Sequence, residues 1–335
     1  MIMATVTAAQ TAEPSLIQQM RNAGLNGVRI NSAHVSPNKL KEMIGQIRAI
    51  DPEITILMDT KGPEMRTTAL ESPISFSAGD TIHITSDTND NPSSESCIRI
   101  NVPMLQSHLS LGQNIEFDDG EISASITDIN GEMITACVTS GGTLGSRKTM
   151  TADGFDSSYL PAVNLRDKLN IQAAKEAGID IIAHSFVRSA EDVTAVKDLV
   201  SGSNTKVFAK IECEPALERL NEIINTADGI LVARGDLGTA IDPCRIPAIQ
   251  AKIIALCIKA NCPTIVATQI MQSMMENPRP TRAELSDIAL GVMQGVDWLL
   301  LCGETAQGKY PVNCVEIMNR TIKTTQQAEL QWKID

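Results

Sequence analysis

Charged and polar side chains recur at the carboxyl ends of short apolar runs in this sequence. Residues two apart on a strand project to the same side, so Lys210 and Glu212 are expected to share a face. Arg29 and Asn31 have the same spacing and are also expected to share a face of their strand. The other polar or small residues that end such runs are Asp59, Thr60, Arg234, Gly235, Asp236, Thr268, Cys302 and Glu304.

These residue types suit a metal ion and an anionic substrate. Glu212 and Asp236 offer the hard carboxylate oxygens that Mg²⁺ prefers, with coordination left for water or substrate oxygens. Arg29 and Lys210 suit an anionic group, most simply a phosphoryl group. Taken singly, each charge also fits an exposed loop or a salt bridge, but together they would be costly without a ligand or metal. The residues alone predict Mg²⁺-assisted chemistry on a small phosphorylated or carboxylate substrate, without selecting the reaction.

The apolar runs alternate with amphipathic segments and predict an α/β protein. Seven of the eight strand-like runs are followed directly by a helix-like segment. Pro37 suits a first helical position, residues 189–192 and 281–284 resemble capping boxes, and Gly24 and Gly178 fit helix ends. Eight strand–helix units predict a parallel (β/α)8 TIM barrel with its chemistry at the carboxyl ends of the strands. The strand-like runs cover residues 1–6, 27–31, 53–59, 180–186, 206–212, 228–236, 263–269 and 296–304.

A segment of different texture interrupts this alternation after the third strand. Between about residues 67 and 160, β-forming runs are separated by turn sequences such as Asp119-Gly120 and Asn130-Gly131, with no helical period. We therefore predict a small all-β domain inserted after barrel strand 3. The predicted domains are a barrel of residues 1–66 and 160–335 and an inserted β-barrel of residues 67–159. An insertion at this end of a barrel strand is expected to act as a lid.

The composition excludes several classes of protein. Hydrophobic residues make up 43% and charged residues 20% of 335, which excludes collagen-like, disordered and small disulfide-stapled proteins. A formal net charge of −12 and 3% aromatic residues argue against nucleic acid as a partner. No segment has the roughly 20 apolar residues of a membrane span, and the start does not resemble a signal peptide. The eight dispersed cysteines are interpreted as buried, reduced thiols in a cytoplasmic protein.

Eight stretches of the sequence resemble the pyruvate kinase family. They run in order over nearly the whole chain, and the longer ones are highly specific. The resemblance implies a barrel with a β-domain inserted after strand 3, which the residue pattern also suggests. It implies phosphoryl transfer from phosphoenolpyruvate to ADP, giving pyruvate and ATP in glycolysis, with Mg²⁺ and K⁺ as cofactors. The stretches are GVRINSAH (27–34), MDTKGPEMRT (58–67), GGTLGSRK (141–148), AKIE (209–212), DGILVARGDLG (228–238), VATQIMQSM (266–274), PRPTRAELSDIA (278–289) and CGETAQGKYP (302–311).

The resemblance also implies a role for each matched residue. Arg29 would bind the substrate phosphate, and Lys210 would stabilise the transferring phosphoryl group. Gly235, with the backbone of Asp236, would receive the substrate carboxylate, and Thr268 would lie beside the enolate. The remaining implied roles are Glu212 and Asp236 for Mg²⁺, Asn31, Asp59 and Thr60 for K⁺, and Asn31, His34, Arg66 and Lys148 for the nucleotide, with Lys148 brought in by closure of the insert.

The sequence departs from the family pattern at several positions. Ala33 stands where the family usually has a serine that binds K⁺, although Glu64 occurs in K⁺-dependent members. Thr7-Ala8 stands where a Gly-Pro pair usually lines the adenine site. Cys302 replaces a serine of the proposed proton relay, which a thiol could still serve. The chain also stops shortly after the eighth helix, so a short form without the C-terminal regulatory domain is expected.

Three functional hypotheses follow. An active pyruvate kinase without allosteric control is favoured. A Mg²⁺-enolate lyase or decarboxylase on a 2-oxo acid is a second, although Lys210 would be superfluous there. A third is a catalytically impaired, ligand-binding relative. A homo-oligomer formed through the barrel is also expected, because residues 278–284 lie near that interface in the family.

Overall fold

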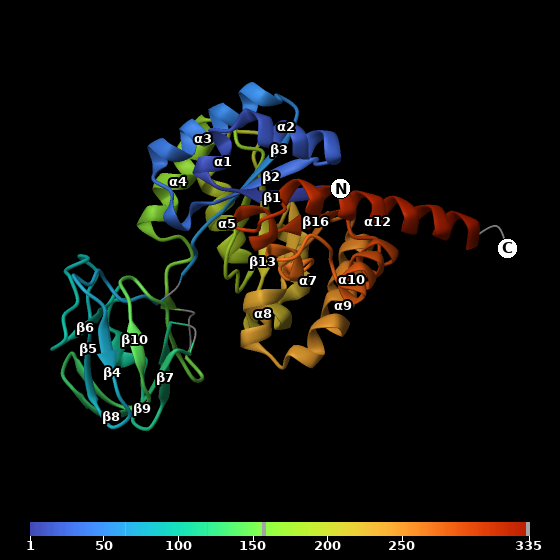
Figure 1. The fold of residues 1–335 in the computed structure, drawn as a ribbon. Helices are drawn as coiled ribbons and strands as arrows, with labels where there is room; N and C mark the ends of the chain where they lie inside the picture. Colours follow the sequence, from blue (N-terminus) through green and yellow to red (C-terminus); the bar gives the residue numbers. More distant parts are fainter. Residues whose placement is uncertain (64, 119, 156–158, 333–335) are drawn as a thin grey trace. The chain divides into compact units, whose positions relative to one another are not determined.

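A closed barrel of eight parallel strands forms the first of two compact units in this computed structural model (Figure 1). The structure describes residues 1–63, 65–118, 120–155 and 159–332. The predicted (β/α)8 barrel is confirmed. In order around the barrel, its strands are β1 (Ile2–Val6), β2 (Gly27–Asn31), β3 (Thr55–Asp59), β12 (Ile181–His184), β13 (Lys206–Ile211), β14 (Gly229–Ala233), β15 (Thr264–Ala267) and β16 (Trp298–Leu301), which pairs with β1.

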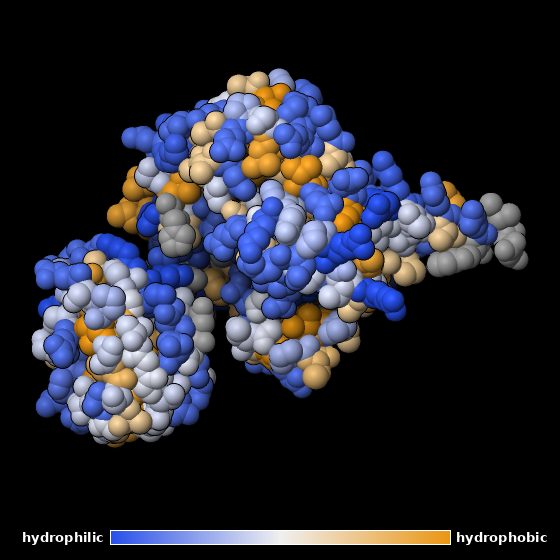
Figure 2. Space-filling model, viewed as in Figure 1, coloured by the Kyte–Doolittle hydropathy of each residue, from blue (hydrophilic) through white to orange (hydrophobic). Residues whose placement is uncertain are grey.

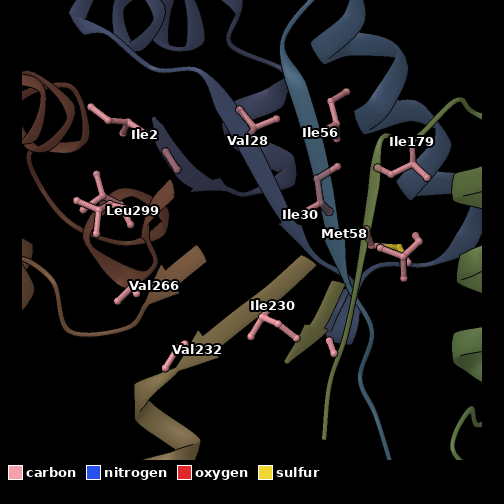
Figure 3. Packing of buried hydrophobic residues seen from close by; sticks show 14 of the residues in the cluster. Ile2, Val28, Ile30, Ile56, Met58, Ile179, Ile230, Val232, Val266 and Leu299 are labelled. Atoms are coloured by element: carbon pink, nitrogen blue, oxygen red, sulfur yellow. The ribbon is translucent and has the colours of Figure 1, made fainter. Parts of the chain in front are cut away.

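Alternate residues of each barrel strand face the inside and the outside of the barrel. Leu57 and Phe208 belong to the small cluster that fills the inside. Asp59 and Lys210 follow them by two residues, so the pleat points both toward the mouth at the carboxyl ends. Figure 3 shows residues of the larger outer cluster that packs beneath the helices, among them Val28, Ile30, Ile56, Met58, Ile230, Val232, Val266 and Leu299.

Helices cover the outside of the barrel strands (Figure 1). One of them, α4, completes the eighth strand–helix unit, although the sequence reading paired no helix with the third strand. The helices are α1 (Ala8–Thr11), α2 (Pro14–Ala23), α3 (Pro37–Ile50), α4 (Leu165–Glu176), α5 (Ala190–Leu199), α6 (Glu214–Glu218), α7 (Leu220–Thr226), α8 (Arg234–Ala240), α9 (Ile246–Ala260), α10 (Arg282–Met293), α11 (Gly303–Ala306) and α12 (Pro311–Trp332), with short 3₁₀ turns η1 (Ser32–His34), η4 (Pro243–Arg245) and η5 (Gln272–Met275).

Most of the predicted helix ends are confirmed. Pro37 is the first residue of α3, and Gly24 ends α2 with a left-handed φ of 114°. Thr281 and Glu284 form the expected capping box of α10. The capping box predicted at Ser189 is wrong, because its side chain makes no cap hydrogen bond. The carboxylate of Asp192 instead accepts from the backbone and guanidinium of Arg188, which outcompetes the serine for it.

The predicted sixth strand extends too far. The structure ends β14 at Ala233 and begins α8 at Arg234. Arg234, Gly235 and Asp236 therefore occupy the first turn of a helix rather than the end of a strand. The side chain of Leu237 is buried and anchors this helical turn, which the strand-like pattern of the sequence does not indicate. The free N–H groups of a first turn point outward, which suits an anionic ligand.

The second unit, Pro63–Pro161, is all β in its described parts, which confirms an inserted all-β domain after the third barrel strand. The residue pattern of the sequence predicts limits of 67 and 159 for this domain. Gly131, with a φ of 59°, turns the chain between the two longest strands, and the expected turn at residues 119–120 lies partly outside the described residues. The unit consists of a six-stranded sheet, β11 (Met150–Ala152), β7 (Asn114–Phe117), β8 (Ile122–Asn130), β9 (Met133–Ser140), β5 (Thr81–Ser86) and β6 (Ile98–Ile100), a two-stranded sheet, β10 (Gly142–Leu144) and β4 (Ile74–Phe76), and the turn η2 (Leu105–Ser107).

On the face viewed in Figure 2, polar residues predominate and hydrophobic ones form scattered patches. Across the described residues, no helix combines the length and the apolar character that a membrane crossing requires.

All eight cysteines are free thiols. Their interpretation as buried is correct for Cys257, Cys262 and Cys314, but Cys244 is exposed and the others are partly exposed.

Candidate active site

Asp59 lies between two cations at the mouth of the barrel. Its Oδ2 is 2.6 Å from Arg29 Nη2 and 3.3 Å from Lys210 Nζ. Burial alone would raise the pKa of Asp59, but the two cations outweigh it and hold that pKa below its usual range. Burial would likewise lower the pKa of Lys210, yet Asp59 and Glu212 raise it, so the ammonium stays charged. The structure thus brings together Arg29, Asp59 and Lys210 as the sequence predicts.

Glu212 is a buried carboxylate with unused acceptor capacity. It is 1% exposed, and Oε1 lies 3.1 Å from Lys210 Nζ. Among the described residues, neither of its oxygens has a partner in hydrogen-bonding geometry. Burial, reinforced by the charge of nearby Asp236, raises the pKa of Glu212 to about 7 despite Lys210. A buried, underused carboxylate is unfavourable in isolation and is the arrangement expected of a cation ligand.

The donor set around Glu212 fits a hard divalent cation. Asp236 is exposed in the first turn of α8 and close enough to affect the pKa of Glu212. In the part of the chain that the structure describes, no group of three or more His, Cys, Asp or Glu residues is arranged for a metal. Two carboxylates with room for water and substrate oxygens suit Mg²⁺ rather than a structural zinc ion.

Arg234 braces a strained turn that carries Thr268. Thr268 and Gln269 both have left-handed φ angles, 75° and 54°, which are unfavourable for side chains of these types. The Arg234 guanidinium donates to the Thr268 carbonyl at 2.7 Å and to the Gln269 carbonyl at 3.2 Å, while Asp287 on α10 holds it at 2.7 Å. A Cβ on Gly235 would lie 2.8 Å from the Thr268 methyl carbon, so only glycine permits this approach.

Cys302 lies against Arg29 at the end of β16. Its Sγ is 3.9 Å from Arg29 Nη1, and burial raises the pKa of the thiol, which is therefore neutral at pH 7. The neighbouring carboxylate of Glu304 is fully buried and accepts from the backbone N–H groups of Cys302 and Met271, at 2.8 and 3.0 Å. Glu304 thus ties the loop after β15 to the loop after β16.

The residues expected to bind K⁺ lie on adjacent strands. Asn31 on β2 is in register with Asp59 on β3, and Thr60 follows Asp59. Asp59 Oδ1 is buried without a hydrogen-bond partner among the described residues. The Asn31 Oδ1, by contrast, accepts from the Ala33 N–H at 3.1 Å. Asp59 is therefore the best placed of the three for a cation.

The residues expected to bind the nucleotide belong to both compact units. The side chain of His34, like the whole of Glu64, lies outside the described residues. Arg66 and Lys148 belong to the second unit, and only their contacts within that unit are considered. There, Arg66 donates to the Arg147 carbonyl at 2.9 Å, and Lys148 Nζ lies 2.7 Å from an Asp118 oxygen.

The family comparison matches the chain from its first residue to the last barrel helix. A family model described as "Pyruvate kinase, barrel domain" covers residues 1–315. The chain belongs to the pyruvate kinase family. This confirms the resemblance recognised in the sequence motifs.

Curated relatives agree with this membership. The chain is 36% identical over 325 residues to a pyruvate kinase of Borreliella burgdorferi, covering 96% of the chain and 67% of the relative. It is 37% identical over 339 residues to a pyruvate kinase of Geobacillus stearothermophilus, covering 98% of the chain and 57% of the relative. It is 35% identical over 347 residues to a human pyruvate kinase, covering 98% of the chain and 60% of the relative. The chain thus spans somewhat more than half to two thirds of the length of these pyruvate kinases.

Two supporting residues and one supporting contact in this pyruvate kinase family site were not predicted from the sequence. Ser185 contacts Lys210, and Asp167 on α4 accepts from the backbone N–H groups of Lys61 and Gly62 at 2.8 and 2.9 Å. The bracing contact of Arg234 was also unforeseen, although the residue itself was singled out. Ser185 had a usable signal, because it directly follows a barrel strand. Asp167 had none, because its partners lie more than a hundred residues away.

Proposed function

We propose that this chain transfers a phosphoryl group from phosphoenolpyruvate to ADP, giving pyruvate and ATP. The observation that carries the proposal is the Lys210 ammonium, nearly buried between Asp59 and the underused carboxylate of Glu212. A fixed cation in a water-poor site is suited to the charge that develops on a transferring phosphoryl group. Membership of the pyruvate kinase family supports the same reaction.

The charge balance explains why this chemistry would need a metal. The site contains two cations, Arg29 and Lys210, and three carboxylates, those of Asp59, Glu212 and Asp236. The formal net charge of these five side chains is −1. Such a site disfavours a phosphorylated, carboxylate-bearing substrate on its own. Mg²⁺ held by Glu212 and Asp236 would neutralise the developing charge on the phosphoryl and enolate oxygens. K⁺ beside Asp59, with Asn31 and Thr60, would add to that effect.

The remaining residues would orient and protonate the substrate. Arg29 would hold the phosphate, and the N–H groups at Gly235 and Asp236 in the first turn of α8 would receive the carboxylate. After phosphoryl transfer, the enolate takes a proton at carbon beside Thr268, which Arg234 holds in place. Because Cys302 is neutral and lies next to Arg29, its thiol is able to relay that proton. The nucleotide roles of Asn31, His34, Arg66 and Lys148 stay predictions. The proposed setting is cytoplasmic, with a second copy of the chain as a partner through the barrel.

The deciding experiment is pyruvate formation from phosphoenolpyruvate with Mg²⁺, measured with and without ADP and K⁺. ADP-dependent pyruvate and ATP in equal amounts are expected. Pyruvate formed equally well without ADP would mean that water, rather than ADP, receives the phosphoryl group. Turnover of a 2-oxo acid in place of phosphoenolpyruvate would select the lyase or decarboxylase. Retained phosphoenolpyruvate binding without any turnover would select the ligand-binding relative, and each of these results would overturn the proposal.

Replacing Cys302 by serine is expected to keep or raise the rate of pyruvate formation. A hydroxyl is smaller than a thiol and forms stronger hydrogen bonds, so a proton relay through this position should improve. The measurement is kcat for the ADP-dependent reaction, with Cys244→Ser as the control because Cys244 is exposed. A fall of about tenfold or more in Cys302→Ser alone would show that the thiol has a role of its own.

A further inference from the structure

We propose that Ser185 is the positioning residue that holds the Lys210 ammonium throughout turnover, an inference that rests on the function proposed above. Ser185 directly follows β12, the strand next to β13 in the barrel. Its hydroxyl accepts from Lys210 Nζ at 2.7 Å, and the residue is 2% exposed. No role for it follows from the sequence motifs.

The two carboxylates that form ion pairs with Lys210, Asp59 and Glu212, are unsuited to a constant hold. Asp59 Oδ2 also receives Arg29 at 2.6 Å, and its other oxygen is open to a cation. Glu212 is the proposed metal ligand, so its contact with Lys210 competes with the metal. Ser185 is neutral and competes for neither ion. Of the three groups that contact Lys210, Ser185 alone is not also expected to bind another cation when metal and substrate bind.

The orientation of the Ser185 hydroxyl is determined by its surroundings. Its proton is donated to the Thr60 carbonyl at 2.7 Å, which leaves an oxygen lone pair facing Lys210. The Ser185 N–H donates to Thr60 Oγ1 at 3.0 Å. This double contact joins the ends of β3 and β12, which are neighbours in the barrel. Ser185 is therefore pre-oriented as an acceptor before any ligand binds.

A buried histidine completes this arrangement. Thr60 Oγ1 accepts from Ser185, so its own proton is best directed to His184 Nδ1, 3.0 Å away. His184 is fully buried, and burial lowers its pKa to about 4, which leaves a neutral ring able to accept. The contacts run from Lys210 to the Ser185 hydroxyl, from the Ser185 N–H to Thr60 Oγ1, and from Thr60 Oγ1 to His184 Nδ1. The other ring nitrogen of His184, Nε2, is buried without a hydrogen-bond partner among the described residues.

The space around Ser185 dictates the choice of variant. A Cβ placed on Gly62 would lie 3.0 Å from both the Ser185 Cβ and its carbonyl oxygen, so Gly62 packs closely against this residue. Ser185→Ala therefore removes the hydroxyl without overpacking. Ser203→Ala is the matched control, because it deletes a hydroxyl that donates to the Val200 carbonyl in the turn before β13, away from the mouth.

The first test observes the Lys210 ammonium without relying on turnover. Its ¹H–¹⁵N signal, assigned by its absence in Lys210→Met, is expected to show slow hydrogen exchange. Loss of a hydrogen bond to a charged group should accelerate that exchange by about tenfold or more in Ser185→Ala, and not in Ser203→Ala. An exchange rate in Ser185→Ala within about twofold of the wild type would overturn the inference.

The second test separates positioning from a structural effect. In the ADP-dependent reaction, Ser185→Ala is expected to lower kcat by about 10- to 100-fold while the phosphoenolpyruvate KM changes little. A variant that lowers only the folded fraction would leave kcat per folded molecule unchanged, and that result would contradict the inference. If the wild type itself showed no turnover, the proposed function would fail, and the exchange measurement would still decide the role of Ser185.

Discussion

Lys210→Met is expected to lower kcat for phosphoryl transfer by about a thousandfold or more. The Lys210 ammonium pairs with both Asp59 and Glu212, and a methionine of similar length fills the space without any charge. Asp59 keeps its contact with Arg29, so the barrel should stay folded. The rate is measured by coupled pyruvate detection, alongside thermal unfolding.

Lys206→Met is the matched control for this prediction. It makes the same change at the other end of the same strand, β13, where the side chain is exposed. Its kcat should stay within about twofold of the wild type, as for most exposed substitutions. If Lys210→Met kept more than about a tenth of the wild-type rate, Lys210 would not be the group that stabilises the transferring phosphoryl group.

The barrel was predictable because its signals are local. A buried parallel strand is a short apolar run, and seven of the eight runs here are followed by turn and helix signals within a few residues. Lys210 and Glu212 could be placed together because the period of a strand is two. The start of α8 at Arg234 was not predictable in this way. The apolar run ends there, and the choice between strand and helix depends on Leu237 and Asp287, whose contacts are tertiary.

The supporting contacts of the site were mostly out of reach of the sequence. Ser185 meets Lys210 across 25 residues and Thr60 across 125. Serine is common in loops, so its type alone carries little information. Arg234 was identifiable as a candidate, but its hydrogen bond to the Thr268 carbonyl depends on the positive φ angles of Thr268 and Gln269. Neither residue type predicts a left-handed backbone. Side-chain chemistry was therefore predictable where the strand period positions it, and unpredictable where distant loops meet.

Glu212→Gln is expected to weaken divalent-cation binding by about 100-fold or more. Substitution of residues that merely support a metal ligand typically costs about 10- to 100-fold, and a ligand itself should cost at least as much. Glutamine preserves the shape of Glu212 but removes the negative charge and one strong acceptor. Because the Glu212 oxygens are in hydrogen-bonding geometry with no described residue, the metal-free variant should fold as the wild type does. Mn²⁺ binding followed by electron paramagnetic resonance, together with the Mg²⁺ dependence of kcat, measures the effect.

The control for Glu212→Gln is Glu214→Gln, which makes the same change two residues further on, at an exposed position that opens α6. Glu214 lies outside the buried cluster, so its loss should leave cation affinity within about twofold. Equal weakening in both variants would mean that general negative charge, rather than a ligand at Glu212, attracts the cation. Unchanged affinity in Glu212→Gln would remove Glu212 from the metal site. The unused oxygens of this carboxylate, and its raised pKa, would then require another explanation.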